Sequence, residues 1–110
     1  MIIDQNENIS IITQEKAAVS ELIKKIEAIY PKFKNNNIVV VLNTLKTLGV
    51  EDVLGFLQLS NKHRASNFSF VIVTDKINMD DVPDEIIVVP TQQEAFDIIE
   101  MEEMERDLGL

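Results

Sequence analysis

The longest uninterrupted apolar run in the chain is Ile-Val-Val-Val-Leu at residues 38–42. A strand with one face in water alternates apolar and polar residues, and this run does not alternate. A continuous run of this kind is typical of a strand that helices cover on both faces, as in a parallel sheet. The pattern therefore predicts a buried central strand, and we expect the fold to be organised around it.

A helix is predicted soon after the central strand, from about Glu51 to Arg64. Asn43 and Thr44 interrupt the apolar run with side chains that bond to nearby backbone, and Gly49 permits backbone angles that other residues avoid. Glu51 and Asp52, at the start of this helix, face the positive end of the helix dipole. Gly55, inside this helix, either allows close packing on the sheet or has no structural role. The apolar positions at helical spacing are Val50, Val53, Leu54, Phe56, Leu57 and Leu59.

The first thirty residues predict an edge hairpin and then an amphipathic helix. Apolar segments at residues 2–3 and 9–12 flank a polar turn, as in a hairpin. A helix is predicted over residues 15–30, and Pro31 is expected to end it, because the residue before a proline avoids helical angles. The apolar face of this helix consists of Val19, Leu22, Ile23, Ile26 and Tyr30.

Two further strands, an acidic loop and a final helix are predicted in the rest of the chain. The strands span residues 68–73 and 86–89, and residues 76–85 form the loop between them. The final helix is expected over about residues 91–108, because Thr91 and Glu94 form a T-x-x-E capping box in which each side chain bonds the other's backbone N–H. Its apolar positions are Ala95, Ile98, Ile99, Met101, Met104 and Leu108.

The predicted elements follow the order β-β-α-β-α-β-β-α, in which strands and helices alternate. Such alternation is typical of a mostly parallel sheet with right-handed crossover connections. We therefore predict a single α/β domain over residues 1–110, with a mixed, mostly parallel sheet of four or five strands.

The composition narrows the range of possible functions. The chain contains no cysteine, which excludes disulfides, thiolate metal sites and a cysteine nucleophile. Its first residues do not combine a basic start with a long apolar stretch, so no secretion signal is expected. No apolar run reaches the roughly 20 residues of a membrane-spanning helix, and we expect a cytoplasmic protein without a membrane partner.

The net charge of −9 is concentrated in the last third of the chain. Residues 1–74 carry seven acidic and eight basic side chains, whereas residues 75–110 carry twelve acidic and two basic ones. An acidic surface repels phosphate backbones, so we expect no nucleic-acid partner. The acidic part is either a solvated surface or a docking face for a basic partner.

In the order of its elements and in its central stretch, the chain resembles the STAS family, whose members are domains of sulfate transporters and anti-sigma-factor antagonists. The resemblance covers about residues 9–99 and rests most on Val-Val-Leu-Asn at 40–43, followed by a loop and a helix with acidic residues at its start. It implies a STAS-like sheet and a role in protein interaction. In regulatory members this helix start carries an Asp-Ser-Ser-Gly-type motif, and a partner kinase phosphorylates one serine to switch binding.

This chain departs from the family at that motif. Aligned without gaps, Glu51 takes the place of the Asp, Asp52 that of the phosphorylated serine, Val53 that of the next serine and Leu54 that of the glycine. The resemblance thus implies a member that lacks the phosphoacceptor. Asp52 carries a fixed negative charge instead, which is part of what phosphoserine would supply. The family's helix before its last strand is also reduced here to the loop at residues 76–85.

The chain is also similar to a set of short bacterial proteins that share its ending, VVPTxxEAxDIIEMEExERDLG, and are often labelled ribonuclease Z. The zinc-dependent ribonuclease Z enzymes need an H-x-H-x-D-H cluster and further histidines for two zinc ions. This chain has one histidine, His63, so we do not expect ribonuclease Z activity. A lone histidine makes no zinc site, and we expect His63 to be a surface or helix-end residue.

Asp80, Asp81, Asp84 and Glu85 form a second candidate for chemistry, because carboxylate oxygens bind hard cations. Their spacing lacks the EF-hand pattern, which favours a solvated acidic loop. Together with His63 as a general base, the cluster defines one alternative function, a small metal-assisted or acid–base enzyme. The chain has no phosphate-binding glycine loop and no G-x-S-x-G elbow, and we expect no cofactor.

The main hypothesis is a non-enzymatic regulatory module that binds a protein partner. The final helix offers apolar residues that either pack on the sheet or form an exposed stripe for a partner or a second copy, as in a homodimer. A further alternative is a structural subunit that docks through this helix. The expected contact residues are Thr44, Thr47, Gly49, Glu51 and Asp52 near the end of the central strand, and Met101, Met104 and Leu108 on the final helix.

Overall fold

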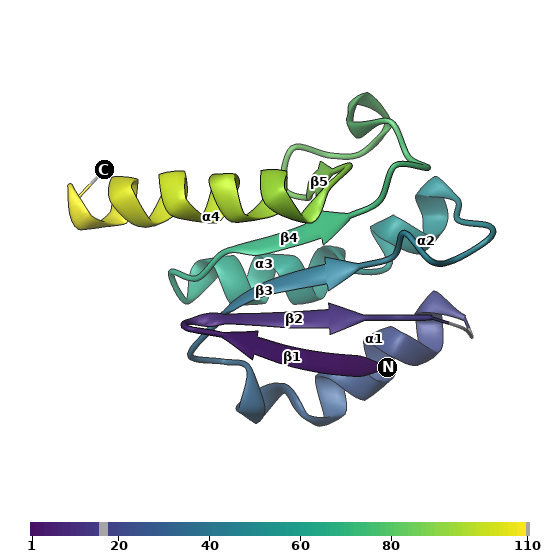
Figure 1. Ribbon diagram of the computed structural model, residues 1–110, viewed down its shortest axis with the longest axis horizontal. Coiled ribbons are helices and arrows are strands. Elements are labelled where there is room, and N and C mark those ends of the chain that lie inside the picture. The colour runs from purple at the N-terminus through teal and green to yellow at the C-terminus, as the bar shows by residue number, and fades with distance from the viewer. Residues whose placement is uncertain (16–17, 110) are drawn as a thin grey trace.

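A five-stranded sheet forms the centre of the computed structural model, which describes residues 1–15 and 18–109. The strands lie side by side in the order of the sequence (Figure 1). The first pair is antiparallel, and the other neighbouring pairs are parallel. The strands are β1 (Ile2–Asn6), β2 (Ile9–Thr13), β3 (Asn37–Val41), β4 (Phe70–Val73) and β5 (Ile87–Val89). This confirms an α/β fold with a mixed, mostly parallel sheet.

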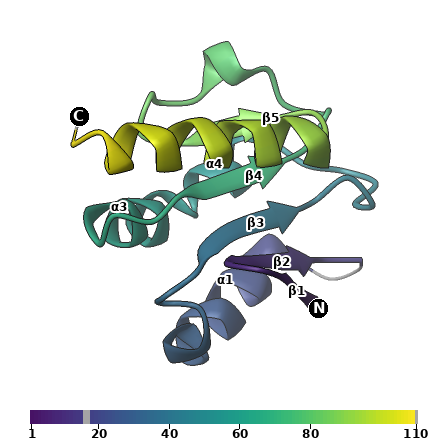
Figure 2. The same ribbon diagram turned by 60° about the vertical axis from the view of Figure 1, so that its left-hand side comes forward.

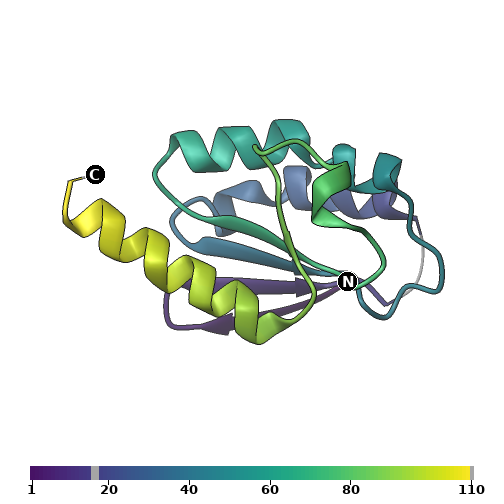
Figure 3. The same ribbon diagram turned by 90° about the horizontal axis from the view of Figure 1, so that it is seen from above.

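Helices cover both faces of the sheet. α1 and α3 lie on one face and α4 lies on the other (Figure 3). On its face, α4 packs across β3, β4 and β5 (Figure 2). The helices are α1 (Val19–Ala28), α2 (Val50–Leu54), α3 (Leu57–Ala65) and α4 (Gln92–Asp107), with two short 3-10 turns, η1 (Tyr30–Lys32) and η2 (Met79–Asp81).

The central strand is buried on both sides, as the continuous apolar run predicted. All five residues of β3 are buried. Ile38 and Val40 belong to the core beneath α1 and α3, whereas Val39 and Val41 belong to the core beneath α4. The lack of alternation in the sequence therefore reflects two separate apolar cores that share one strand.

The prediction of a helix over residues 15–30 is wrong at both ends. Residues 16 and 17 lie outside the described part of the chain, and α1 begins at Val19 after an extended Ala18. At the other end α1 stops at Ala28, and Pro31 lies inside η1 rather than after a helix. A proline is tolerated in the first turn of a helix, because the N–H that it lacks has no partner there.

The helix expected from Glu51 to Arg64 is divided into α2 and α3. The division falls at Gly55 and Phe56, and the Phe56 side chain is fully buried. A Cβ atom at Gly55 would lie 2.9 Å from Cδ1 of Ile23 in α1 and 3.2 Å from the backbone oxygen of Asp52. The glycine therefore allows a close approach to α1, not to the sheet.

The end of the chain follows the prediction with small differences. β4 starts at Phe70 rather than at residue 68, because the Ser69 N–H donates to the Asn37 side chain over 2.7 Å instead of to a backbone oxygen of β3. Thr91 caps α4 by accepting a hydrogen bond from the Glu94 N–H at 3.2 Å. The Glu94 carboxylate was predicted to accept from the Thr91 backbone N–H, but it accepts from the Thr91 hydroxyl instead, at 3.1 Å.

The hairpin between β1 and β2 contains a strained residue, and its replacement is a test of the turn. Glu7 has a φ of 56°, in the left-handed region that side chains disfavour. We expect Glu7→Gly to raise the free energy of unfolding by about 0.5–1 kcal/mol, measured by urea unfolding. Asn67 has a φ of 69°. Asparagine tolerates this region, so Asn67→Gly is the control, and an equal gain in both variants would contradict the explanation.

Candidate functional site

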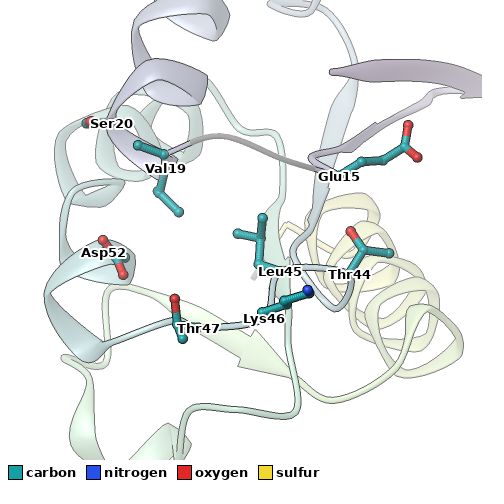
Figure 4. Close-up of a pocket in the computed structure, with 9 residues that line it drawn as sticks. Glu15, Val19, Ser20, Thr44, Leu45, Lys46, Thr47 and Asp52 are labelled. Carbon is teal, nitrogen blue, oxygen red and sulfur yellow. The ribbon is translucent and has the colours of Figure 1, made fainter.

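An open hollow of about 710 Å³ lies where the chain leaves the carboxyl ends of β2 and β3 (Figure 4). Open α/β sheets bind their ligands at this edge. The hollow contains three of the residues that the sequence singled out, namely Thr44, Thr47 and Asp52. Its lining residues are Glu15, Ala18, Val19, Ser20, Thr44, Leu45, Lys46, Thr47 and Asp52.

Hydrogen bonds to the ends of the neighbouring strands hold the first part of the loop after β3. The Thr44 hydroxyl donates to the backbone oxygen of Gln14 at 2.7 Å, which ties the loop to the end of β2. Asn43 donates to the backbone oxygen of Pro90 at 3.3 Å and accepts from the Asp75 N–H at 3.0 Å. The loop is therefore anchored to three other segments, while Thr47 remains exposed at the hollow.

Asp52 holds a fixed position at the start of α2. Its carboxylate accepts a hydrogen bond from the Gly49 N–H at 2.9 Å, and its own N–H donates to the Gly49 oxygen at 3.1 Å. The side chain is exposed and lines the hollow. Gly49 and Glu51 are not among the lining residues, although they flank Asp52 in the same turn. The structure thus separates the predicted loop residues into three that line the hollow and two beside it.

The hollow combines charged and hydroxyl groups above an apolar floor. Glu15 and Asp52 contribute carboxylates, and Lys46 contributes one ammonium group. The floor consists of the buried side chains of Val19 and Leu45. Ser20, Thr44 and Thr47 contribute the hydroxyl groups. Such a surface offers a partner several hydrogen bonds and a charge pattern around a small apolar contact.

The apolar residues singled out on α4 lie on the opposite face of the sheet from α1 and α3. Met101, Met104 and Leu108 expose 56%, 59% and 73% of their surface, so the interpretation that they pack on the sheet is wrong. The core face of α4 is instead formed by Ala95 and Ile99. The predicted contact residues therefore form two separate regions, one at the loop and one on α4.

Polar side chains, not apolar ones, attach the second half of α4 to the sheet. Glu102 forms an ion pair with Arg64 at 2.6 Å and accepts a hydrogen bond from the Ser69 hydroxyl at 2.6 Å. Arg106 donates to Ser69 at 3.3 Å and to the Asn37 side chain at 3.4 Å. This network could not be predicted from the sequence, because its members come from four separate segments.

His63 is buried, and the expectation of a surface histidine is wrong, although the residue does lie in the last turn of α3. Nε2 lies 2.6 Å from the backbone oxygen of Asn36, which can only accept, so Nε2 carries the proton. Nδ1, 2.6 Å from the Tyr30 hydroxyl, then accepts from it. Burial lowers the pKa of His63 below 6.5, against a smaller opposite effect of the Asn36 carbonyl.

A signal for this burial is present in the sequence. His63 follows Phe56 and Leu59 at the spacing of one helix face, and both of those residues are buried. Aromatic rings surround the imidazole, with centroids 5.6 Å away for Tyr30 and for Phe68. His63 is therefore a structural residue of the core, engaged at both ring nitrogens.

The acidic residues Asp80, Asp81, Asp84 and Glu85 are exposed in the connection between β4 and β5. Within residues 1–15 and 18–109, no group of three or more His, Cys, Asp or Glu side chains is placed to hold a metal ion. Over the same residues, no helix combines the length and apolar character that crossing a bilayer requires.

No protein-family model matches the chain, and no curated protein matches it. The likeness to STAS domains therefore stays a prediction that rests on the residues of the chain.

Proposed function

We propose that the chain is a non-enzymatic regulatory domain that binds a protein partner at the hollow beside β2 and β3. We call this hollow the loop site and define it by Ser20, Thr44, Lys46, Thr47 and Asp52. The observation that carries the proposal is the gathering of Thr44, Thr47 and Asp52 in one open hollow whose backbone is anchored to the neighbouring strands. A surface that is already ordered loses little conformational entropy when a partner binds.

The resemblance to STAS domains gives Asp52 a specific role in this proposal. It places Asp52 where regulatory members carry the phosphorylated serine. The exposed carboxylate, held by the Gly49 N–H at 2.9 Å, presents a permanent negative charge at the loop site. We propose that the chain is a member fixed in one charge state, so that binding needs no kinase.

The alternative of an acid–base enzyme has weaker support. It assigns the general base to His63, whose ring is buried and hydrogen-bonded at both nitrogens. A general base must reach the proton that it abstracts, and this imidazole is enclosed by protein atoms. The interaction domain is therefore the function that the geometry favours.

The test is affinity capture from extract of the cells in which the protein is expressed, with bait variants that separate charge from fold. Asp52→Asn removes the charge but keeps an oxygen that accepts from Gly49, so the start of α2 stays capped. Glu51→Gln is the matched control, because it removes the neighbouring exposed charge outside the hollow. We expect Asp52→Asn to weaken binding of the purified captured partner about tenfold and Glu51→Gln to leave it unchanged.

Two results would contradict the proposal. One is an affinity of Asp52→Asn equal to that of the unchanged chain. The other is an equal loss in both variants, which would indicate a general effect of net charge. Asp52→Lys provides a stronger variant that reverses the charge, and it should abolish binding while the chain stays folded. Its lost cap costs about 0.5–2 kcal/mol of stability, which circular dichroism and urea unfolding would measure.

A further inference from the structure

A continuous apolar stripe runs along the outer side of α4. We define the α4 stripe as Ile98, Met101, Met104 and Leu108, of which Ile98 is half-buried and the others are exposed. From Ile98 to Leu108 the stripe covers roughly 15 Å, or about three helical turns. The last turns of α4 project past the sheet (Figures 1 and 3), so a partner can approach this side without meeting the strands.

The orientation of the α4 stripe is fixed by the opposite side of the helix. There Glu102 bonds to Arg64 and Ser69, and Arg106 bonds to Ser69 and Asn37. Rotating the helix to bury the methionines would break these bonds and carry two charged groups away from their partners. The exposure of the stripe is therefore a built-in property of α4 in this fold.

The charges around the α4 stripe all have one sign. α4 contains seven acidic residues and one basic residue, Arg106, which is turned towards Ser69 and Asn37. Glu102 is paired with Arg64, and Glu103 accepts a hydrogen bond from Asn8. The other five acidic side chains are exposed, namely Glu94, Asp97, Glu100, Glu105 and Asp107.

A shallow hollow of about 260 Å³ adjoins the stripe where α4 passes β5. Val89, Ile98 and Met101 form its apolar walls, and Glu94 and Asp97 stand beside them. This arrangement can accept an apolar side chain together with a nearby basic group. It matches how amphipathic helices bind, with apolar anchors flanked by charges that select the partner.

We propose that the α4 stripe binds a basic amphipathic helix of a partner protein. A second copy of this chain is a poor occupant, because it would bring the same acidic rim against this one and like charges repel across an interface. Methionine side chains suit such a contact, since they are flexible and adapt to different apolar shapes. This binding is independent of the loop site and lies on the other face of the sheet.

The test is selection of binders from a displayed library of random peptides on the immobilised full chain. We expect selected peptides to carry apolar residues at helical spacing with Lys or Arg between them, and to bind less tightly at raised salt. Met101→Glu/Met104→Glu should weaken their binding by about tenfold or more. Met79→Glu is the matched control, because Met79 is as exposed as Met104, at 59%, but lies in η2.

A double variant without added charge keeps the test valid, because the carboxylates added in Met101→Glu/Met104→Glu would attract basic peptides and offset part of the loss. Met101→Ser/Met104→Ser removes the apolar surface without changing charge and should also weaken binding, while circular dichroism confirms the fold. Asp52→Asn should leave peptide binding unchanged, so a failure here is distinct from a failure at the loop site. Selected peptides without basic residues, or peptides that bind the methionine variants equally well, would overturn the proposal. Self-association that Met101→Ser/Met104→Ser abolishes would overturn it in favour of a second copy.

Discussion

Acidification from about pH 7 to about pH 5 is expected to destabilise the fold through His63. The unfolded histidine has a pKa near 6.5, whereas burial lowers the pKa of His63 in the folded chain. Below about pH 6.5 the unfolded chain therefore binds a proton that the folded chain refuses, and stability falls until the pH reaches the folded pKa. One proton corresponds to at most about 1.4 kcal/mol for each pH unit.

The measurement is the free energy of urea unfolding across this range for the unchanged chain and for His63→Gln. The glutamine amide can still donate to the Asn36 carbonyl, but it gains no proton on acidification. Carboxylates titrate in both proteins, so the difference between the two curves reports His63 alone. We expect that difference to narrow as the pH falls, and parallel curves would contradict the assignment.

His63→Gln should also cost about 1–3 kcal/mol at neutral pH, because the Tyr30 hydroxyl loses its acceptor. Burial raises the pKa of Tyr30, so this hydroxyl keeps its proton and remains a donor that needs a partner. The two effects are separable, since the loss of the hydrogen bond is present at every pH and the proton effect appears only on acidification.

Replacement of Asn37 should produce the other large loss of stability. The buried Asn37 side chain accepts from the Ser69 N–H at 2.7 Å and from Arg106 at 3.4 Å. Asn37→Leu leaves the buried Ser69 N–H without its partner and weakens the attachment of α4, at a cost of about 1–3 kcal/mol.

Urea unfolding measures this cost, and Asn35→Leu is the control. Asn35 is exposed two residues earlier, so the same substitution there should change stability by less than about 0.5 kcal/mol. Hydrogen exchange adds a local measurement, because the amides of the second half of α4 should exchange faster in Asn37→Leu. Equal stability of the two leucine variants would show that the network does not hold α4.

The apolar pattern was sufficient to predict a mixed, mostly parallel sheet with a central strand buried on both sides. Ile38 and Val40 face one core and Val39 and Val41 the other, because side chains alternate along a strand whatever covers them. The division between α2 and α3 was not predictable in this way. It depends on Phe56 entering the core and on Ile23 of α1 approaching Gly55, and both contacts require the tertiary structure.

The candidate site was predictable only in part. The position of Thr44 and Asp52 beyond the central strand follows from local sequence, but the contribution of Glu15 and Ser20 depends on how β2 and α1 pack beside β3. Helical spacing with Phe56 and Leu59 indicates that His63 faces the core, but its hydrogen-bond partners, Tyr30 and Asn36, belong to a different segment. Periodicity describes the side of a helix, whereas hydrogen-bond partners distant in sequence decide the role of a polar residue on that side.

The exposure of Met101, Met104 and Leu108 on α4 also depends on contacts that periodicity does not describe. Helical spacing placed Ile98, Met101 and Leu108 on one side, but it did not reveal which side of α4 meets the sheet. The polar residues Glu102 and Arg106 decide this, because they find partners at the ends of α3, β3 and β4. The sequence therefore predicts an apolar stripe on α4, but it does not predict whether the stripe faces the sheet or the solvent.

The most direct measurement of the central claim is the amide spectrum of the ¹⁵N-labelled chain during titration with the partner captured through the loop site. We predict that the largest shifts fall on Ser20, Thr44, Thr47 and Asp52, which line one hollow. We also predict that these shifts become markedly smaller when Asp52→Asn replaces the unchanged chain at the same concentrations, and that they disappear with Asp52→Lys. Shifts confined to other surfaces, with these four amides unmoved, would contradict the proposal that this hollow is where the chain performs its function.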